Sequence, residues 1–364
     1  MKLRRKFIST IILSVFVLSG CSNASNEVTQ NEETQNEVID EVETTNNENV
    51  GIDTYSVVTT GYSAYDWTRE IIGDTDVNVE YTMLLDNGVD THSYQPTVED
   101  IVKISEADMF IYVGGVSDYW VEEVLESSTN DDMIVINMFD VLSDELVYEE
   151  LVDGMEETEH SHDHSDDETE EHTEEDHDHE HVETEHSHLE YDEHLWLSLN
   201  NALKVCEEIT DSLAILDSEN EESYRANFDR YSSKLTDLDS EYKEVVENGT
   251  YDTLIFADRF PFRYLVDDYG LNYYAAFSGC SAETEASFET IIFLAQKVDE
   301  LGLNYVINID NSVNKIDETV INSTENKDEE ILVLNSIQKV KTTDETTYLD
   351  VMESNLENIK TALE

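Results

Sequence analysis

Nine of the eleven histidines of this chain lie in one stretch of thirty residues, Glu159 to His188, where they alternate with Asp and Glu. Neutral imidazole and carboxylate are the groups that bind borderline divalent metals, and a short His-rich tract is typical of metal binding. Only Val182 in the stretch is apolar, so the stretch cannot build a core. The composition predicts an auxiliary metal-binding loop, with a solvated acidic linker as the alternative. Its histidines are His160, His162, His164, His172, His177, His179, His181, His186 and His188.

The two remaining histidines, His92 and His194, lie in polar segments beside predicted helix starts. Each has an acidic residue close by, in the tripeptides DTH and DEH. Loops at strand ends are where α/β proteins bind ligands, and imidazole is an ordinary zinc ligand. For each histidine the alternative is a plain surface position. The shared setting of the two predicts that both bind a metal.

The N-terminus predicts export and a lipid anchor. Residues 1–20 combine a basic start with an apolar stretch, as a signal peptide does, and the stretch is too short for a transmembrane helix. The tetrapeptide LSGC that ends at Cys21 resembles the bacterial lipobox, in which the Cys becomes the lipidated first residue. We therefore expect the mature protein at the cell membrane, lipid-anchored on the extracytoplasmic face.

The composition is strongly acidic, with 19 Lys and Arg against 86 Asp and Glu and a formal net charge of −67. Nucleic acid and anionic lipid are poor partners for such a surface. Residues 21–50 are acidic and polar without apolar periodicity, which predicts a disordered tether. After Cys21 only Cys206 and Cys280 remain, and both are expected to be free.

The elements that must position these residues alternate between strands and helices, which predicts parallel sheets with helices on both faces. We expect an N-terminal α/β lobe at 51–150, a disordered His/acid-rich loop at 151–190 and a C-terminal α/β lobe at 249–364. The predicted strands are Tyr55–Thr60, Val79–Leu85, Met109–Val113, Met133–Asn137, Thr253–Ala257, Tyr273–Phe277, Tyr305–Ile309 and Ile331–Leu334.

Between the lobes, residues 191–248 are predicted to hold a ligand loop and a long linking helix, from about Ser218 to Val246. Apolar residues recur there at spacings of four and three, which gives one continuous stripe. A coiled coil would show the same pattern. The setting favours one backbone helix that joins the two lobes, with a ligand cleft between them. The stripe comprises Tyr224, Phe228, Tyr231, Leu235, Leu238, Tyr242 and Val245.

Several motifs resemble those of the lipoproteins and periplasmic proteins that feed zinc and manganese ABC importers. The stretch DNGVDTHSYQPT around His92 resembles the signature loop of this family, and DEHLWLSLNNA around His194 resembles its second His motif. Two further similar stretches are YGLNYYAAFSGCSAETEAS and the C-terminal YLDVMESNLENIKTAL. The resemblance extends from about Tyr55 to the end of the chain. The zinc-binding members also carry a His-rich acidic loop in the same place.

The resemblance implies a metal site made by His92, His194 and Asp310, the last at the family's carboxylate position after a strand. The family's third His falls on Arg259, and a cation cannot bind the metal. Neighbouring Asp258 is a candidate substitute, with a helix N-cap or an ion pair to Arg259 as the alternative role, and water or a loop histidine are the other candidates for the fourth position. Cys280 is a soft alternative ligand, although its position in the family is not a ligand.

The predicted function is therefore an extracytoplasmic solute-binding lipoprotein that captures Zn²⁺ and delivers it to the permease of an ABC importer. The protein is expected to be a monomer and not an enzyme, since the sequence has no HExxH motif. A manganese-binding member of the same family remains an alternative, as does a zinc-storage or adhesin surface lipoprotein. The His-rich loop favours zinc, and we expect it to act as a collector beside the site.

Overall fold

The computed structural model describes residues 54–364 apart from 87, 90, 157–189, 282–284, 311 and 313. The predicted signal peptide, the lipidation site Cys21, the tether and the nine loop histidines lie outside the described residues. Among the described residues, no helix is both long enough and apolar enough to span a membrane.

The first lobe contains a four-stranded parallel sheet in the order β2-β1-β3-β4. Its strands are short and rich in β-branched and aromatic residues, as buried parallel strands are. The elements are β1 (Thr54–Thr59), α1 (Tyr62–Ile72), β2 (Asn78–Met83), η1 (Thr91–Ser93), α2 (Val98–Ser105), β3 (Met109–Tyr112), η2 (Val116–Asp118), α3 (Trp120–Glu126), β4 (Ile134–Asn137) and α4 (Met138–Val141).

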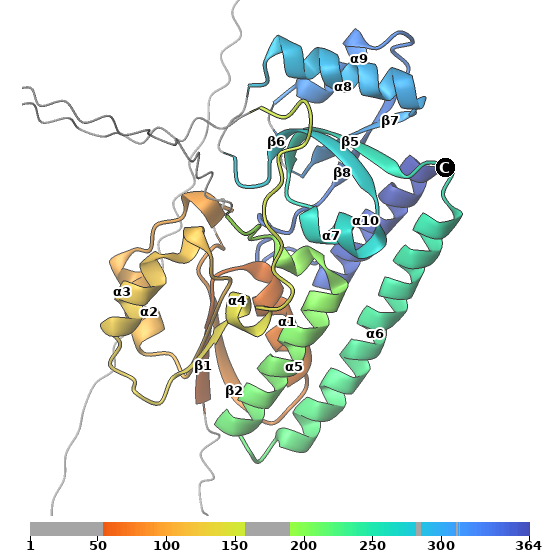
Figure 1. Cartoon of the computed structure of the whole chain (residues 1–364). Coiled ribbons are helices and arrows are strands. Elements are labelled where there is room, and N and C mark those ends of the chain that lie inside the picture. The colour runs from red at the N-terminus through yellow and green to blue at the C-terminus, as the bar shows by residue number, and fades with distance from the viewer. Residues whose placement is uncertain are drawn as a thin grey trace, which may run out of the picture. The chain divides into compact units, whose positions relative to one another are not determined.

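The second lobe repeats this topology, with a parallel sheet in the order β6-β5-β7-β8 (Figure 1). The predicted fold class, two small α/β lobes with parallel sheets and flanking helices, is therefore confirmed. The elements are β5 (Thr253–Phe260), α7 (Arg263–Tyr269), β6 (Asn272–Ser278), α8 (Phe288–Leu301), β7 (Tyr305–Ile309), α9 (Ile316–Ser323), β8 (Glu330–Leu334) and α10 (Tyr348–Leu363).

Three elements connect the lobes: η3 (Leu195–Leu197), α5 (Leu199–Leu216) and α6 (Glu221–Asn248). Helix α6 contacts α1, α5, α7 and α10, and Figure 1 shows it running past both lobes. Five members of the predicted stripe are buried, while Phe228 and Val245 are partly buried against the core. Tyr242 donates its hydroxyl to the carbonyl of Met352, 2.6 Å away, which attaches α6 to α10. The apolar stripe therefore packs within the molecule and does not form a coiled coil.

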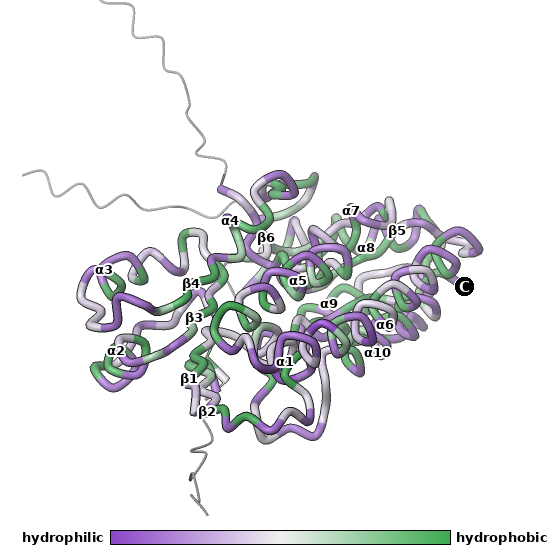
Figure 2. The backbone as a smooth tube through the Cα atoms, turned by 90° about the horizontal axis from the view of Figure 1, so that it is seen from below, coloured by the Kyte–Doolittle hydropathy of each residue, from purple (hydrophilic) through white to green (hydrophobic). Residues whose placement is uncertain are grey.

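Alternate residues of each central strand face different cores, as the period of two requires. In β5, Leu254 and Phe256 belong to a central cluster, whereas Ile255 and Ala257 face α8 and α9. In the first sheet Val57 belongs to the same central cluster, and its neighbour Val58 faces α2 and α3. Both sheets thus turn one face toward a single shared core. Figure 2 shows both hydrophilic and hydrophobic residues along α2 and α3, as expected of helices that bury one face.

Two short stretches pair directly before His194. Tyr148 and Tyr191 form an antiparallel bridge with stacked rings, and Glu149 donates its amide to the carbonyl of Glu190 at 2.9 Å. On the next rung, Asp192 donates its amide to the carbonyl of Val147 at 2.9 Å. From Glu149 the chain continues along the second lobe to Glu156, whose amide donates to the carbonyl of Ala276 at 3.0 Å. The described chain therefore resumes after the His-rich segment beside His194, but stops before it at the second lobe.

The predicted end of the strand that starts at Thr253 was wrong in a way that affects the site. We expected the strand to end at Ala257, but β5 continues to Phe260 and α7 starts only at Arg263. Arg259 and Phe260 still pair with β6 after an irregularity in the register, so the sheet continues through this segment. Asp258 therefore lies inside a strand and is not a helix cap.

Asp66 on α1 forms a buried hydrogen bond to α10, and the cost of its buried charge can be measured. Its buried carboxylate accepts the amide of Tyr348 at 2.9 Å, and burial raises its pKa to about 6. Because the pKa is raised on folding, the folded protein bears the full cost of the buried charge above about pH 6 and loses that cost as the pH falls toward 4. Replacing Asp66→Asn is expected to help stability more at pH 7.5 than at pH 4.5, by about 2 kcal/mol.

Urea unfolding of both proteins at the two pH values measures this difference. Asn keeps an oxygen that can accept the Tyr348 amide, so the comparison isolates the charge. A pH-independent difference between the two proteins would contradict the prediction.

Candidate metal site

His92 lies on η1, in the segment that follows β2. Its Nδ1 is 2.9 Å from the hydroxyl of Ser117 and 3.2 Å from Oε2 of Glu193. Ser117 also donates its amide to Glu193 at 2.7 Å and its hydroxyl to the same carboxylate. Burial alone raises the pKa of Glu193, but hydrogen bonds from His92 and Ser117 outweigh it and lower that pKa. Glu193 is therefore an anion that orients the His92 ring.

His194 precedes η3 and is fully buried. Its Nδ1 is 3.0 Å from Oδ1 of Asp192, and the same oxygen accepts the backbone amide of His194 at 2.8 Å. Burial by itself lowers the pKa of His194, but the carboxylate of Asp192 outweighs burial and raises it. Each site histidine thus has a carboxylate on Nδ1, an arrangement that fixes the tautomer and leaves Nε2 for a metal.

The two Nε2 atoms face one another at 3.2 Å. When Nδ1 of both rings carries the proton, both Nε2 atoms present lone pairs, and a cation between them relieves the repulsion. Two nitrogens bound to a tetrahedral zinc at about 2.0–2.1 Å lie about 3.3–3.4 Å apart. The observed separation therefore suits one small divalent metal ion.

Gln338 closes another side of the site. Its amide nitrogen lies 2.7 Å from Nε2 of His194 and 3.4 Å from Nε2 of His92. The preceding residue, Ile337, is buried with φ at +66°, a strained conformation for a β-branched residue. Such strain occurs where the surrounding structure holds a segment in place, often at functional sites. Here it turns the chain so that Gln338 reaches the histidine pair.

Cys280 follows β6 and completes a group of three possible ligands with His92 and His194. One ligand atom from each of the three lies within 4.8 Å of the other two. Among the described residues, these three are the His, Cys, Asp or Glu side chains that lie close enough together to bind one metal ion. Burial, and then the nearby carboxylate of Glu149, raises the pKa of the Cys280 thiol.

The two predicted carboxylate ligands lie outside this group. Asp310 follows β7 and accepts the amide and hydroxyl of Ser336, at 2.7 and 3.0 Å. The hydroxyl of Ser336 lies 3.4 Å from the amide oxygen of Gln338, so Asp310 is linked to the site through these two side chains. Asp258 accepts the amide of Arg259 at 2.7 Å and the side-chain amide of Asn314 at 3.1 Å.

The sequence analysis missed Gln338 and Ser117 altogether and noted Glu193 only as an acidic residue beside His194. Gln338 lies 246 positions after His92, in a segment without any metal-binding motif. Glu193 did carry a signal, because it stands directly before His194. Glu193, however, contacts His92 and not its neighbour His194, and this long-range contact can be seen only in the folded chain.

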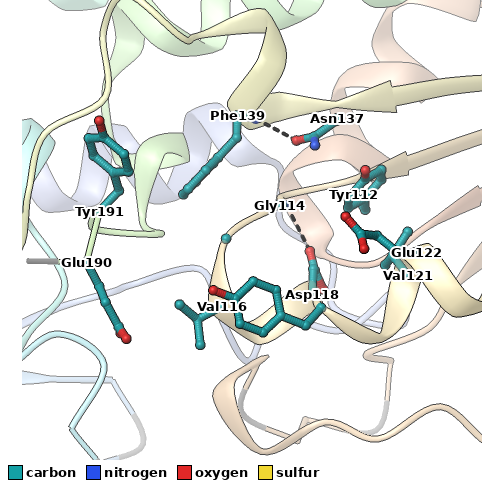
Figure 3. Close-up of a pocket in the computed structure, with 12 residues that line it drawn as sticks. Tyr112, Gly114, Val116, Asp118, Val121, Glu122, Asn137, Phe139, Glu190 and Tyr191 are labelled. Atoms are coloured by element: carbon teal, nitrogen blue, oxygen red, sulfur yellow. Dashed lines mark hydrogen bonds between the residues drawn. The ribbon is translucent and has the colours of Figure 1, made fainter. Parts of the chain in front are cut away.

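A cavity of ≈ 490 Å³ is lined by Val116 and Asp118, the two neighbours of Ser117 in the chain (Figure 3). The buried carboxylate of Asp118 accepts the amide of Gly114. The lining of the cavity includes Asp118, Tyr119 and Tyr191 but none of the three possible metal ligands. This cavity is therefore a neighbour of the metal site and not the site itself.

Comparison with known proteins agrees with this arrangement of parts. A family profile described as zinc-uptake complex component A, periplasmic, matches residues 57–362. The chain belongs to this family of metal-uptake binding proteins.

Among curated relatives, the zinc-binding lipoprotein AdcA of Streptococcus pneumoniae is 30% identical over 305 residues, which cover 84% of this chain and 55% of that protein. The chain thus spans about half the length of this relative. The high-affinity zinc uptake system protein ZnuA of Bacillus subtilis is 27% identical over 311 residues, 85% of this chain and 88% of that protein.

Solved structures share the fold. The Zn(II)-bound ZnuA-like domain of AdcA from S. pneumoniae gives a TM-score of 0.62 at 24% identity and covers 85% of this chain and 99% of that domain. The metal-dependent lipoprotein YcdH of B. subtilis gives 0.64 at 23% identity, with 85% and 99% covered.

Gly115 tests whether Glu193 holds the site together. Its φ is +78°, and a Cβ placed there would lie 2.5 Å from Oε1 of Glu193. Gly115→Ala is expected to displace Glu193, release the His92 ring and weaken zinc binding by roughly 10–100-fold, as loss of an outer-shell partner does. Isothermal titration in the presence of a competing chelator measures the change.

Gly302→Ala is the control for a new Cβ at a positive φ, because Gly302 has φ +65° and a Cβ there meets nothing within 4 Å. Gly302 is left-handed helical, where Ala costs about 1 kcal/mol, whereas Gly115 with ψ −165° lies in a region almost confined to glycine, where the cost is about 1–3 kcal/mol. The stability of both variants is therefore measured beside their zinc affinity. Equal zinc affinity in the two variants would show that Glu193 does not control the site.

Proposed function

We propose that this protein captures Zn²⁺ outside the cytoplasm and delivers it to an ABC importer. The observation that carries this proposal is the pair of Nε2 atoms 3.2 Å apart, each ring held by a carboxylate on Nδ1. Zinc is here the cargo and not a resident cofactor. The relatives named above as zinc-binding and zinc-uptake proteins support the same cargo.

In this proposal His92 and His194 supply the two nitrogen ligands. Asp310 remains a predicted oxygen ligand, at the same edge of the second sheet. To bind the metal directly, its Oδ1 has to release Ser336. Asp258 is the weaker candidate, because its two oxygens already accept hydrogen bonds from Arg259 and Asn314.

The cellular setting is part of the proposal. Cys21 is the proposed lipid attachment site, residues 1–20 the signal peptide and residues 21–50 the tether, so that a monomer is held on the extracytoplasmic face of the cell membrane. The divisions of the folded part at 51–150, 191–248 and 249–364 are likewise proposed. The nine histidines of the loop are proposed to collect zinc next to the site, since the last of them, His188, stands six residues before His194.

Two other classes of function make different predictions. A metallohydrolase would need a general base beside an open metal position, and a hydrolase screen with a His92→Ala control tests for it. A storage protein or adhesin would bind zinc without supporting uptake. A deletion strain that fails to grow in low zinc and recovers in excess zinc would support transport over both.

The first test removes the ligands from a chain in which residues 157–189 are replaced by a short Gly-Ser linker. The linker joins Glu156, whose amide donates to the carbonyl of Ala276, to Glu190, whose carbonyl accepts the amide of Glu149, so both flanking contacts are kept. His92→Ala and His194→Ala are each expected to lower zinc affinity by more than the roughly 100-fold loss typical of outer-shell changes. Competition with a chelator measures the affinity, and a change below tenfold in both variants would contradict the proposed site.

The second test compares metals in the same loop-deleted chain. Imidazole nitrogens suit zinc, whereas manganese favours carboxylate and other oxygen ligands. We expect Zn²⁺ to displace Mn²⁺ from the site in a competitive titration followed by the Mn²⁺ electron paramagnetic resonance signal. Retention of Mn²⁺ against equimolar Zn²⁺ would favour the manganese alternative.

A further inference from the structure

Cys280 occupies the place in the second lobe that His92 occupies in the first. The two sheets have the same strand order, so β6 corresponds to β2. His92 lies in the segment after β2, and Cys280 lies two residues after the end of β6 at Ser278. Carboxyl ends of parallel strands are where such sheets bind ligands. The two lobes thus present one metal-binding side chain each from corresponding loops.

The backbone around Cys280 is built for close approach to the histidines. Gly279 precedes it, and a Cβ on Gly279 would lie 3.0 Å from Cε1 of His194 and 2.8 Å from the carbonyl oxygen of Phe260. The amide of Cys280 donates to Oε1 of Glu149 at 2.9 Å, which fixes the loop from the other side. The packing of Gly279 against His194 and the hydrogen bond from Cys280 to Glu149 therefore hold the thiol close to the two imidazole rings.

We propose that Cys280 binds the cargo metal directly, as a thiolate that joins Nε2 of His92 and Nε2 of His194 in a three-residue ligand set. A nitrogen or sulfur ligand to zinc lies about 2.0–2.3 Å from the ion, so ligand atoms within 4.8 Å of one another need only a small contraction. The amide of Gln338 faces the remaining side. This inference rests on the proposed function, because it concerns the same metal site.

Binding releases one proton. The S–H bond of Cys280 breaks, a bond forms between the metal and the sulfur, and the proton passes to solvent by way of the Glu149 carboxylate next to the loop. No oxidant or reductant is involved. A metal ion drives this step, because a coordinated thiol is deprotonated outright.

The ligand set determines which metals the site prefers. Thiolate is soft and suits zinc, whereas manganese favours oxygen ligands. The thiolate therefore supplies in this chain the selectivity that a third histidine cannot provide, since Arg259 stands at that position. Loss of the thiol should weaken zinc binding far more than manganese binding.

Cobalt(II) spectroscopy of the full chain tests the proposal directly. A thiolate bound to Co²⁺ gives an intense charge-transfer band in the near ultraviolet, which imidazole and carboxylate ligands do not give. The His-rich loop contains no cysteine, so it cannot produce this band even if it binds cobalt. We expect the band in the parent protein and in the Cys206→Ala and Cys21→Ala controls, and its loss in Cys280→Ser.

Zinc and manganese affinities of Cys280→Ser provide the second readout. In the loop-deleted chain, the zinc affinity should fall by about 100-fold or more and the manganese affinity by less than about threefold, as the ligand preferences of the two metals require. If Cys280→Ser does not fold, the cobalt spectra of the parent, Cys206→Ala and Cys21→Ala still test the proposal. A thiolate band in all three proteins assigns the band to Cys280, and no band in the parent contradicts the proposal.

The outcomes separate this inference from the proposed function. A parent protein that binds zinc and cobalt through His92 and His194, but without the thiolate band, overturns the role of Cys280 and leaves zinc capture intact. A loop-deleted parent that binds neither metal overturns both.

Discussion

The metal site depends on one interaction that occurs twice, a carboxylate hydrogen-bonded to imidazole Nδ1. Glu193 holds the ring of His92, and Asp192 holds the ring of His194. The two carboxylates are adjacent in sequence, yet they serve histidines 102 positions apart. One short segment therefore sets the orientation of both rings and, through them, the 3.2 Å separation of the Nε2 atoms. A shift of this segment changes both ligands at once.

The fold holds that segment by topology. Both sheets turn their carboxyl edges toward the site, and both share one core with α1, α5, α6, α7 and α10. Of the possible metal ligands, His92 lies after β2, Cys280 after β6 and His194 before η3, while Gln338 follows β8. The two lobes are alike in strand order but different in what their loops carry. The loops therefore carry the candidate ligands, and the sheets fix the positions of the loops.

The α/β rhythm, the spacing of the α6 stripe and the two motif histidines could all be predicted from the sequence, because periodicity and motifs are local signals. The extension of β5 through Asp258 could not, since strand pairing with β6 decides it. The contact of Gln338 with the histidines depends on a long-range turn at the strained Ile337, which no local pattern encodes. Cys280 was recognised as a soft ligand, but its distance from the rings needed the folded chain.

The shared core has a kinetic consequence. Opening the lobes as rigid bodies would expose apolar surface at roughly 25 cal/mol per Å², including the buried contact of Trp67 with Tyr348. Rigid-body opening of the lobes is therefore costly, whereas small displacements of the loops around the histidines leave the shared core intact. If the histidine pair holds an ion, as proposed, those loops are the part of the protein whose movement would release it.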